Sequence, residues 1–340
     1  MERLKTILCK IKYYRIICIV LVILFLTVAL VMNGLIKKGI NSLEDQNFYK
    51  RWDEKGRFAQ ISYFIKSEYA YGSDNIAELE YNLEKNINTE GIETEEGSKL
   101  FVDCYSGKSN VSISNDSKRM DVNCIAVGGD FFYFHPIKMI SGNYFSGDDI
   151  MKDGIVIDEQ TAWQLFGSSD VAGREVYFGD RAIYIKGVYE REDNKIYSYA
   201  RGNEPEIFIS FELLEEMGFY TPITTLELCI PNPVDNFAAE LANKVVSIDA
   251  SSCEMIENSE RFTVESLWNV NKNRKYRAMQ NNDVLFPYWE KVARYEEEVL
   301  APYAVTMCVC FVVSGVIAVG LVIYELTNLT RFRKNDHDIE

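Results

Sequence analysis

Two long apolar stretches near the ends of the chain constrain its fold more than any other feature. Residues 16–36 and 302–324 contain no Lys, Arg, Asp or Glu and are 21 and 23 residues long. As α-helices they would measure roughly 31 and 35 Å, and the apolar core of a bilayer is about 30 Å thick. Each stretch is therefore predicted to cross a membrane once. The first stretch is longer than the apolar part of a cleavable signal peptide, and no small-residue cleavage site follows it, which favours a retained anchor.

Basic residues at the two ends of the chain predict its orientation. Five precede the first stretch and three follow the second, namely Arg3, Lys5, Lys10, Lys12 and Arg15, then Arg331, Arg333 and Lys334. Because such residues favour the cytoplasmic side, residues 1–15 and 325–340 are expected in the cytoplasm and residues 37–300 outside it. Residues 1–15 also have the spacing of an amphipathic helix at the membrane surface. Lys37 and Lys38 are a weak contrary signal.

The segment between the apolar stretches is strongly acidic. Residues 39–300 hold 26 Lys and Arg against 46 Asp and Glu. This negative charge argues against nucleic acid as a partner. The length suffices for one large domain or two smaller ones.

Four of the eight cysteines lie in this outer segment, at Cys104, Cys124, Cys229 and Cys253. An even number in an oxidising compartment permits two disulfides. Of the three possible connectivities, pairing of neighbours along the chain is preferred, Cys104 with Cys124 and Cys229 with Cys253. No metal site is expected, because the outer segment has no C-x-x-C and a single histidine, His135.

No pattern of the sequence predicts an enzyme or a bound cofactor. His135 follows an aromatic run and precedes Pro136, which is typical of a packed side chain rather than a catalytic base. The adjacent Asp148 and Asp149 are expected to point into solvent from a turn. The 340 residues contain neither G-x-S-x-G nor the phosphate-binding G-x-x-x-x-G-K-[ST].

The apolar periodicity predicts an α+β outer domain, possibly two-lobed, with helical stalks leading to both membrane spans. Ser73 is expected to cap a helix that runs to about Ile87, and Asp158 to cap a second helix that Gly167 ends. Further helices are expected at 233–246 and 278–300. Short strands are expected at 58–65, 100–105, 111–114, 120–127, 155–157, 176–178, 182–188, 207–210 and 224–230.

Residues 129–188 contain the most specific pattern. It reads GDFFYFHPIKMISGNYFSGDD, then GIVIDEQTAWQLFGSSDVAGREVYF, then RAIYIKGVYER. The order and spacing resemble the large extracytoplasmic domain of MacB-type ABC transporter permeases, the MacB/FtsX/LolC group. The matching positions are Asp130, Phe131, Gly142, Phe145, Asp149, Ala162, Leu165, Phe166, Gly167, Gly173, Val176, Ile185, Gly187 and Val188.

The resemblance implies a non-catalytic membrane subunit that works with a separate ABC ATPase. Permeases of the family have four spans, whereas this sequence ends sixteen residues after Tyr324. A partner permease chain is therefore expected to supply further transmembrane helices. The implied role is export or mechanotransmission of a peptide, lipid or antimicrobial compound. The matching residues are expected to serve structure, with Gly142 and Gly173 in turns of positive φ.

A sensor or adaptor is the alternative reading of the same layout. Such a protein would bind an envelope ligand or protein outside the membrane, without an ATPase. The short tail at 331–340 offers little surface for signalling inward, which favours the transporter subunit.

Overall fold

The computed structural model describes residues 2–92, 99–147, 149, 152–192, 194–277 and 283–337. The chain divides into two compact units. The helical unit comprises Met1–Ser42, Thr263–Ala278 and Glu296–Glu340, and the sheet unit comprises Leu43–Phe262 and Met279–Tyr295. Each unit is described by itself.

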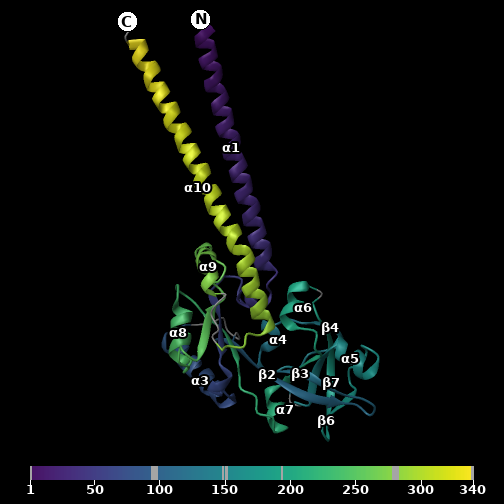
Figure 1. Ribbon diagram of the computed structural model, residues 1–340. Helices are drawn as coiled ribbons and strands as arrows, with labels where there is room; N and C mark the ends of the chain where they lie inside the picture. Colours follow the sequence, from purple (N-terminus) through teal and green to yellow (C-terminus); the bar gives the residue numbers. More distant parts are fainter. Residues whose placement is uncertain are drawn as a thin grey trace. The chain divides into compact units, whose positions relative to one another are not determined.

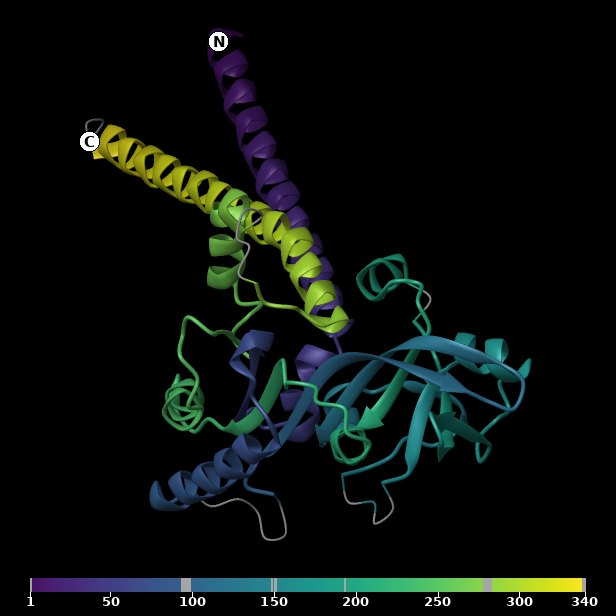
Figure 2. The ribbon, with the colours of Figure 1, turned by 60° about the horizontal axis from the view of Figure 1, so that its bottom comes forward.

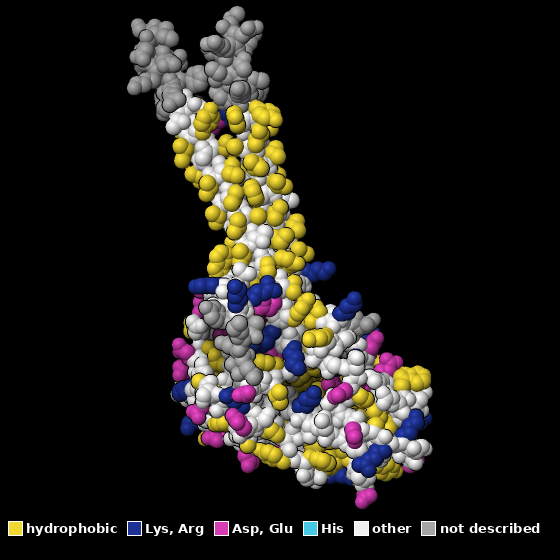
Figure 3. Space-filling model, in the orientation of Figure 1, with side chains coloured by type: hydrophobic (Ala, Val, Ile, Leu, Met, Phe, Trp, Pro, Cys, Tyr) yellow, Lys and Arg dark blue, Asp and Glu magenta, His cyan; other side chains and the backbone are white. Residues whose placement is uncertain are grey.

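The helical unit contains α1 (Glu2–Asn41), α9 (Val264–Arg277) and most of α10 (Tyr288–His337) (Figure 1). Two segments are long and apolar enough to cross a membrane, Tyr13–Asn41 and Tyr288–Asn328. Many of their large apolar side chains are exposed, and Figure 3 shows them gathered along both helices. Exposed apolar surface of this extent is typical of helices that face lipid.

Helices α1 and α10 approach each other closely within the helical unit. A Cβ atom added to Gly39 would lie 2.8 Å from the Leu300 side chain. At the other end of the pair, Arg15 and Glu325 form an ion pair of 2.7 Å. Small residues at such positions let helix backbones come close together in membranes.

Helix α10 begins at Tyr288, directly after Pro287 and later than the helix predicted at 278–300. Pro302, the first residue of the second apolar stretch, lies inside α10. The expected helix at 278–300 is therefore wrong over 283–287, and residues 278–282 lie outside the described residues. Pro287 favours a helix start at this point because its fixed φ suits the first turn of a helix. Its missing N–H costs nothing there, since the first N–H groups of a helix have no acceptor within the helix.

A single ten-stranded mixed sheet forms the sheet unit. Its order is β10-β1-β9-β2-β3-β8-β5-β7-β4, and β6 pairs with β2 and β7. The pairs β3–β8 and β5–β7 are parallel and the others antiparallel. The strands are β1 (Phe58–Ile65), β2 (Val102–Ser114), β3 (Arg119–Gly129), β4 (Lys138–Gly142), β5 (Gly154–Asp158), β6 (Glu175–Phe178), β7 (Arg181–Glu190), β8 (Glu206–Ser210), β9 (Thr225–Pro231) and β10 (Cys253–Glu257). One sheet therefore runs through the described part of the unit.

Short helices complete the sheet unit. They are η1 (Asp45–Asn47), α2 (Phe48–Trp52), η2 (Ser67–Tyr69), α3 (Ser73–Thr89), α4 (Phe131–Phe134), α5 (Glu159–Phe166), α6 (Lys195–Arg201), α7 (Phe211–Glu216) and α8 (Phe237–Val245). Figure 2 shows the long hairpin of β2 and β3 crossing this unit.

Apolar cores cover both faces of the sheet. In β3, Cys124 and Ala126 belong to the first core, which includes α3, α5 and α8. Ile125 and Val127 belong to the second core, which includes α2, α4 and the first residues of α10. Because successive side chains of a strand point to opposite faces, such strands are apolar almost throughout.

Several predicted elements are confirmed by the structure. Strand β1 covers 58–65. Helix α3 buries the expected apolar face, but its N-cap is Gly72, and Ser73, predicted as the cap, is its first residue. Asp158 caps α5 by accepting a 2.7 Å bond from the Thr161 N–H, and Gly167 ends α5 at φ 70°. The predicted break between strands 100–105 and 111–114 is wrong. Strand β2 continues through it because β3 pairs with every residue from Cys104 to Ser114.

A buried polar network as the candidate functional site

Charged and polar side chains are buried in the second core of the sheet unit. His135, Glu227 and Glu290 are each no more than 2% exposed, and Asp45 and Gln60 are also buried. Charged groups are costly to bury unless they are paired and hydrogen-bonded. The ion pairs and hydrogen bonds of these side chains therefore show how this part of the sheet unit is stabilised.

His135 forms an ion pair through each ring nitrogen. Its Nδ1 lies 2.8 Å from Oδ1 of Asp45, and its Nε2 lies 2.5 Å from Oε2 of Glu227. The single turn of α4 positions the ring, since the His135 N–H donates to the Phe131 carbonyl at 2.8 Å. Trp289 stacks against the ring with centroids 4.3 Å apart. Burial lowers the pKa of His135, but Glu227 and Asp45 outweigh burial and raise the pKa to about 9.

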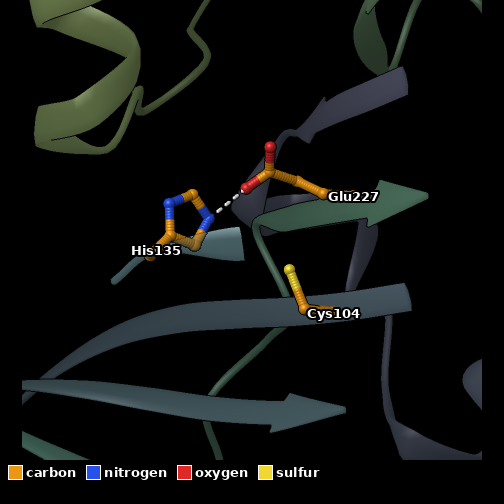
Figure 4. Close-up of side chains that lie close together, drawn as sticks. All are labelled: Cys104, His135 and Glu227. Carbon is orange, nitrogen blue, oxygen red and sulfur yellow. Dashed lines mark hydrogen bonds and ion pairs between the residues drawn. The ribbon is translucent and has the colours of Figure 1, made fainter. Parts of the chain in front are cut away.

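The register of three central strands brings Ser62, Glu227 and Cys104 into one row. Glu227 of β9 lies directly opposite Ser62 of β1 and opposite Cys104 of β2. Such cross-strand neighbours have Cβ atoms about 5 Å apart on the same face. Ser62 Oγ donates to Glu227 Oε1 at 2.6 Å. Figure 4 shows the Cys104 sulfur pointing toward the space between His135 and Glu227.

The network continues from β1 toward the start of α10. Asn258 donates from Nδ2 to Ser62 Oγ at 2.8 Å, and its Oδ1 accepts from Arg261 at 3.2 Å. The guanidinium of Arg261 binds both carboxylate oxygens of Glu290, at 2.7 and 2.8 Å. A bidentate pair of this kind is strong and directional.

Further contacts hold the first turns of α10 and the segment that follows α1. Arg294 donates to Glu290 at 2.7 Å and also pairs with Glu254 of β10. Gln46 Nε2 donates to the carbonyl of Trp289 at 3.3 Å. Within the sheet unit, one continuous network therefore joins residues 45–48, strands β1 and β9, and residues 289–294.

The chemistry of the network is that of a structural or ligand-binding site rather than of a catalytic one. Burial raises the pKa of the Cys104 thiol well above its usual value, and Glu227 raises it further. Such a thiol is a poor nucleophile. The side chains of Cys104, His135 and Glu227 nevertheless form a set that could hold a metal ion, because their donor atoms lie within 4.8 Å of one another.

The four outer cysteines do not pair as the sequence suggested. Cys104 lies opposite Gly129 and Cys124 opposite Ser109, which separates them by five positions along β2 and β3. That offset is roughly 17 Å, whereas a disulfide needs Cα atoms within about 7 Å. Cys229 and Cys253 lie on β9 and β10, and β1 runs between these strands. All four are free cysteines, so the predicted local pairing is wrong.

Sequence reasoning missed the polar network as a site. Asp45, His135 and Glu227 come from η1, the residue after α4, and β9, so no local spacing connects them. Two signals were present in the sequence. His135 is the only histidine of the outer segment, and Glu227 interrupts an otherwise apolar strand.

Comparisons with known proteins identify related sequences. The family model of the MacB-like periplasmic core domain matches residues 16–250. The macrolide export ATP-binding/permease protein MacB of Chromobacterium violaceum is 34% identical over 80 residues, which are 22% of this chain and 12% of that protein. The protein of the same name from Neisseria gonorrhoeae is 30% identical over 70 residues, 20% of this chain and 11% of that protein. The matches thus span only about a tenth of these relatives.

Solved structures of two extracytoplasmic regions are also similar. The periplasmic region of MacB from Actinobacillus actinomycetemcomitans has a TM-score of 0.42 and 12% identity, over 65% of this chain and 94% of that one. The extracellular domain of the noncanonic ABC-type transporter YknZ from Gram-positive bacteria has a TM-score of 0.38 and 15% identity, over 58% and 99%. At these scores the family assignment rests on the sequence model.

The family model covers α1 from Ile16 onward and most of the sheet unit, more than half of the chain. Among the described residues, one candidate membrane helix lies largely within the match and another follows it, as expected of a membrane protein with an extracytoplasmic domain. The chain belongs to the MacB-like periplasmic core domain family, whose members are permease components of ABC transporters.

Proposed function

We propose that this chain is a non-catalytic membrane subunit of a MacB-like ABC transporter system. The observation that carries the proposal is the family match over residues 16–250, which includes the first apolar helix. The curated relatives are named as both ATP-binding and permease proteins. The 340 residues here hold no phosphate-binding G-x-x-x-x-G-K-[ST], so the ATP site lies outside them. A separate ABC ATPase supplies it in our proposal.

The proposed topology places both termini in the cytoplasm and the sheet unit outside it. The basic residues before Ile16 and after Tyr324 support this orientation. The acidic outer segment is consistent with it, because a segment with 46 Asp and Glu against 26 Lys and Arg is not attracted to an anionic inner membrane surface. Exposed apolar side chains along α1 and α10 support the two crossings.

The proposed role is export or mechanotransmission of a peptide, lipid or antimicrobial compound. Helix α10 is unbroken over 50 residues, so its first turns in the sheet unit and its apolar part form one helix. The polar network fixes those first turns to β1 and β9 through Glu290 and Arg261. Transmission of motion between the membrane part of α10 and the sheet is part of this proposal. A partner permease chain contributes further transmembrane helices in this proposal.

The test is a mild-detergent purification of the tagged chain from its native membrane, followed by mass spectrometry. We expect an ATPase with a phosphate-binding loop and a protein with several membrane spans. An untagged strain, processed in parallel, controls for proteins that bind the resin. Recovery of the chain alone, or with envelope proteins only, would contradict the transporter subunit and favour the sensor or adaptor.

A further inference from the structure

Three side chains buried in the second core are of the residue types that bind metal ions. Cys104 offers a sulfur, His135 a ring nitrogen and Glu227 a carboxylate oxygen, all buried and within 4.8 Å of one another (Figure 4). Zinc binds these donors at about 2.0–2.3 Å, which sets tetrahedral donor atoms roughly 3.4–3.6 Å apart. Side-chain shifts of about 1 Å would bring the three atoms to that spacing. We propose that Cys104, His135 and Glu227 bind a zinc-class divalent cation.

The atoms that surround the three ligands match those of a metal centre. Asp45 holds Nδ1 of His135 at 2.8 Å, which leaves Nε2 directed at Glu227 and the metal position. Ser62 holds the other carboxylate oxygen of Glu227 at 2.6 Å. Metal-bound histidines almost always give their second nitrogen to a carboxylate or carbonyl, and bound carboxylates are themselves hydrogen-bonded. Both features, the contact of Asp45 with His135 and the hydrogen bond of Ser62 to Glu227, are present in the structure.

A buried donor beside the cluster has no partner. Trp289 stacks on His135, and among the described residues its Nε1 has no hydrogen-bond acceptor. A bound water or ion is one of the common partners of a buried polar atom that has no protein partner. Three protein ligands leave one position of a tetrahedral ion for water. Such a water is the kind of acceptor that Trp289 lacks.

Exchange of protons for the cation would limit the charge added to the buried site. Both ring nitrogens of His135 face carboxylate oxygens, which only accept hydrogen bonds, so Nε2 carries a proton that a cation would displace. Metal ligands bind in their deprotonated forms, so the Cys104 thiol proton would leave as well. Loss of two protons balances the two charges of the cation.

The donor atoms select the class of cation. Thiolate and imidazole favour zinc and other borderline or soft ions, whereas magnesium and calcium prefer oxygen ligands throughout. The cluster joins β2, the residue after α4, and β9, which are distant in sequence. A bound ion would therefore crosslink these three segments, and the disulfides predicted from the sequence do not form there. The inference rests on this geometry alone and stands whether or not an ATPase partner is found.

The test uses the full-length chain purified in mild detergent with a tag free of histidine and cysteine. Cells are grown with added zinc, the protein is washed with chelator, and metal is measured by mass spectrometry. We expect about one zinc ion per chain. The variant Cys104→Ser should lower zinc content at least about tenfold, since even outer partners of a ligand change affinity 10–100-fold. Cys124→Ser is the matched control, because Cys124 is also fully buried but belongs to the first core.

A second measurement reports on the metal–sulfur bond itself. The chain produced with cobalt in place of zinc should show a thiolate-to-cobalt charge-transfer band, kept in Cys124→Ser and lost in Cys104→Ser. Wild-type protein with neither zinc nor this band would overturn the proposal. Equal zinc content in the two serine variants would also overturn it, because the ion would then be bound elsewhere or adventitiously.

Discussion

At Gly142 the backbone takes a conformation that other residues rarely adopt. Its φ is +69°, and an added Cβ would lie 2.1 Å from the Lys186 carbonyl oxygen. Gly173 also has a positive φ, +84°, but an added Cβ would meet nothing within 4 Å. A comparison of substitutions at the two glycines therefore distinguishes the cost of backbone strain from the cost of a steric clash. Both were predicted from the sequence to need positive φ, and the structure confirms it.

We expect Gly142→Ala to destabilise the sheet unit by about 3 kcal/mol or more, because strain and overpacking add. Gly173→Ala should cost only about 1 kcal/mol, from strain alone. Thermal unfolding of the purified full-length chains, followed by tryptophan fluorescence, measures the difference. Equal losses in the two variants would show that the clash at Lys186 is relieved by movement of the chain.

Single residues also show where sequence reasoning stops. The positive φ of a turn glycine or the cap of Asp158 depends on a few adjacent residues, so the sequence predicts it. The partners of His135 are 90 and 92 positions away in sequence. The register of β1, β9 and β2 aligns Ser62, Glu227 and Cys104, and that register is not visible in a single sequence. Asp45 and His135 reach Glu227 only through the packing of η1 and α4 against the sheet. The polar network, and with it the ligand set, therefore needed the structure.

At the scale of elements, the start of α10 depends on one buried ion pair. Arg261 and Glu290 are at most 5% exposed and bind each other through two hydrogen bonds. Removal of Arg261 would leave the Glu290 carboxylate with its hydrogen bond from Arg294 on α10. Breaking a buried pair costs about 3–5 kcal/mol because one charge stays buried without full compensation.

We expect Arg261→Ala to lower the free energy of unfolding by about that amount, 3–5 kcal/mol. Lys138→Ala is the control, since Lys138 pairs with Glu190 on the surface with a side chain 78% exposed. An exposed pair contributes less than about 1 kcal/mol. Denaturant unfolding of both variants tests the contrast. A loss for Arg261→Ala no larger than for Lys138→Ala would mean that the network does not hold the first turns of α10.

Elements with a complete local pattern were predicted, and elements without one were missed. Helix α3 has apolar residues at helical spacing, and β1 lies between clear breaks, so both were identified. Strands β4 and β10 have no such pattern. Only their pairing with β7 and β1 defines them. Helix α9 is polar along most of its length and was also missed.

At the scale of the whole molecule, the sequence predicted two apolar helices around an α+β domain but not the order of the strands. Helix spans follow from composition and length alone. Strand order depends on pairs such as β1 with β10, which are separated by nearly 190 residues. The pairing of α1 with α10 was likewise not predicted. Within the helical unit it depends on close approach at Gly39.

We expect Gly39→Leu to weaken the pairing of α1 and α10, because the new side chain would meet Leu300 at 2.8 Å from its first carbon. Overpacking of this kind costs about 1–3 kcal/mol. Gly34→Leu is the matched control on the same helix, since a Cβ there meets nothing within 4 Å. The melting temperature of the purified chain should fall for Gly39→Leu and stay near wild type for Gly34→Leu. The same change in both would contradict a close contact at Gly39.

The proposed topology makes a prediction that involves both membrane helices and the sheet unit. Tyr199 of α6 is 93% exposed, so a cysteine there would be open to any reagent on its side of the membrane. We expect Tyr199→Cys, in a Cys253→Ser background, to react with a membrane-impermeant maleimide in intact protoplasts. The parent without Tyr199→Cys should stay unlabelled there, because Cys104, Cys124 and Cys229 are buried. Labelling of Tyr199→Cys only after lysis would place the sheet unit in the cytoplasm and reverse the orientation inferred from the basic ends of the chain.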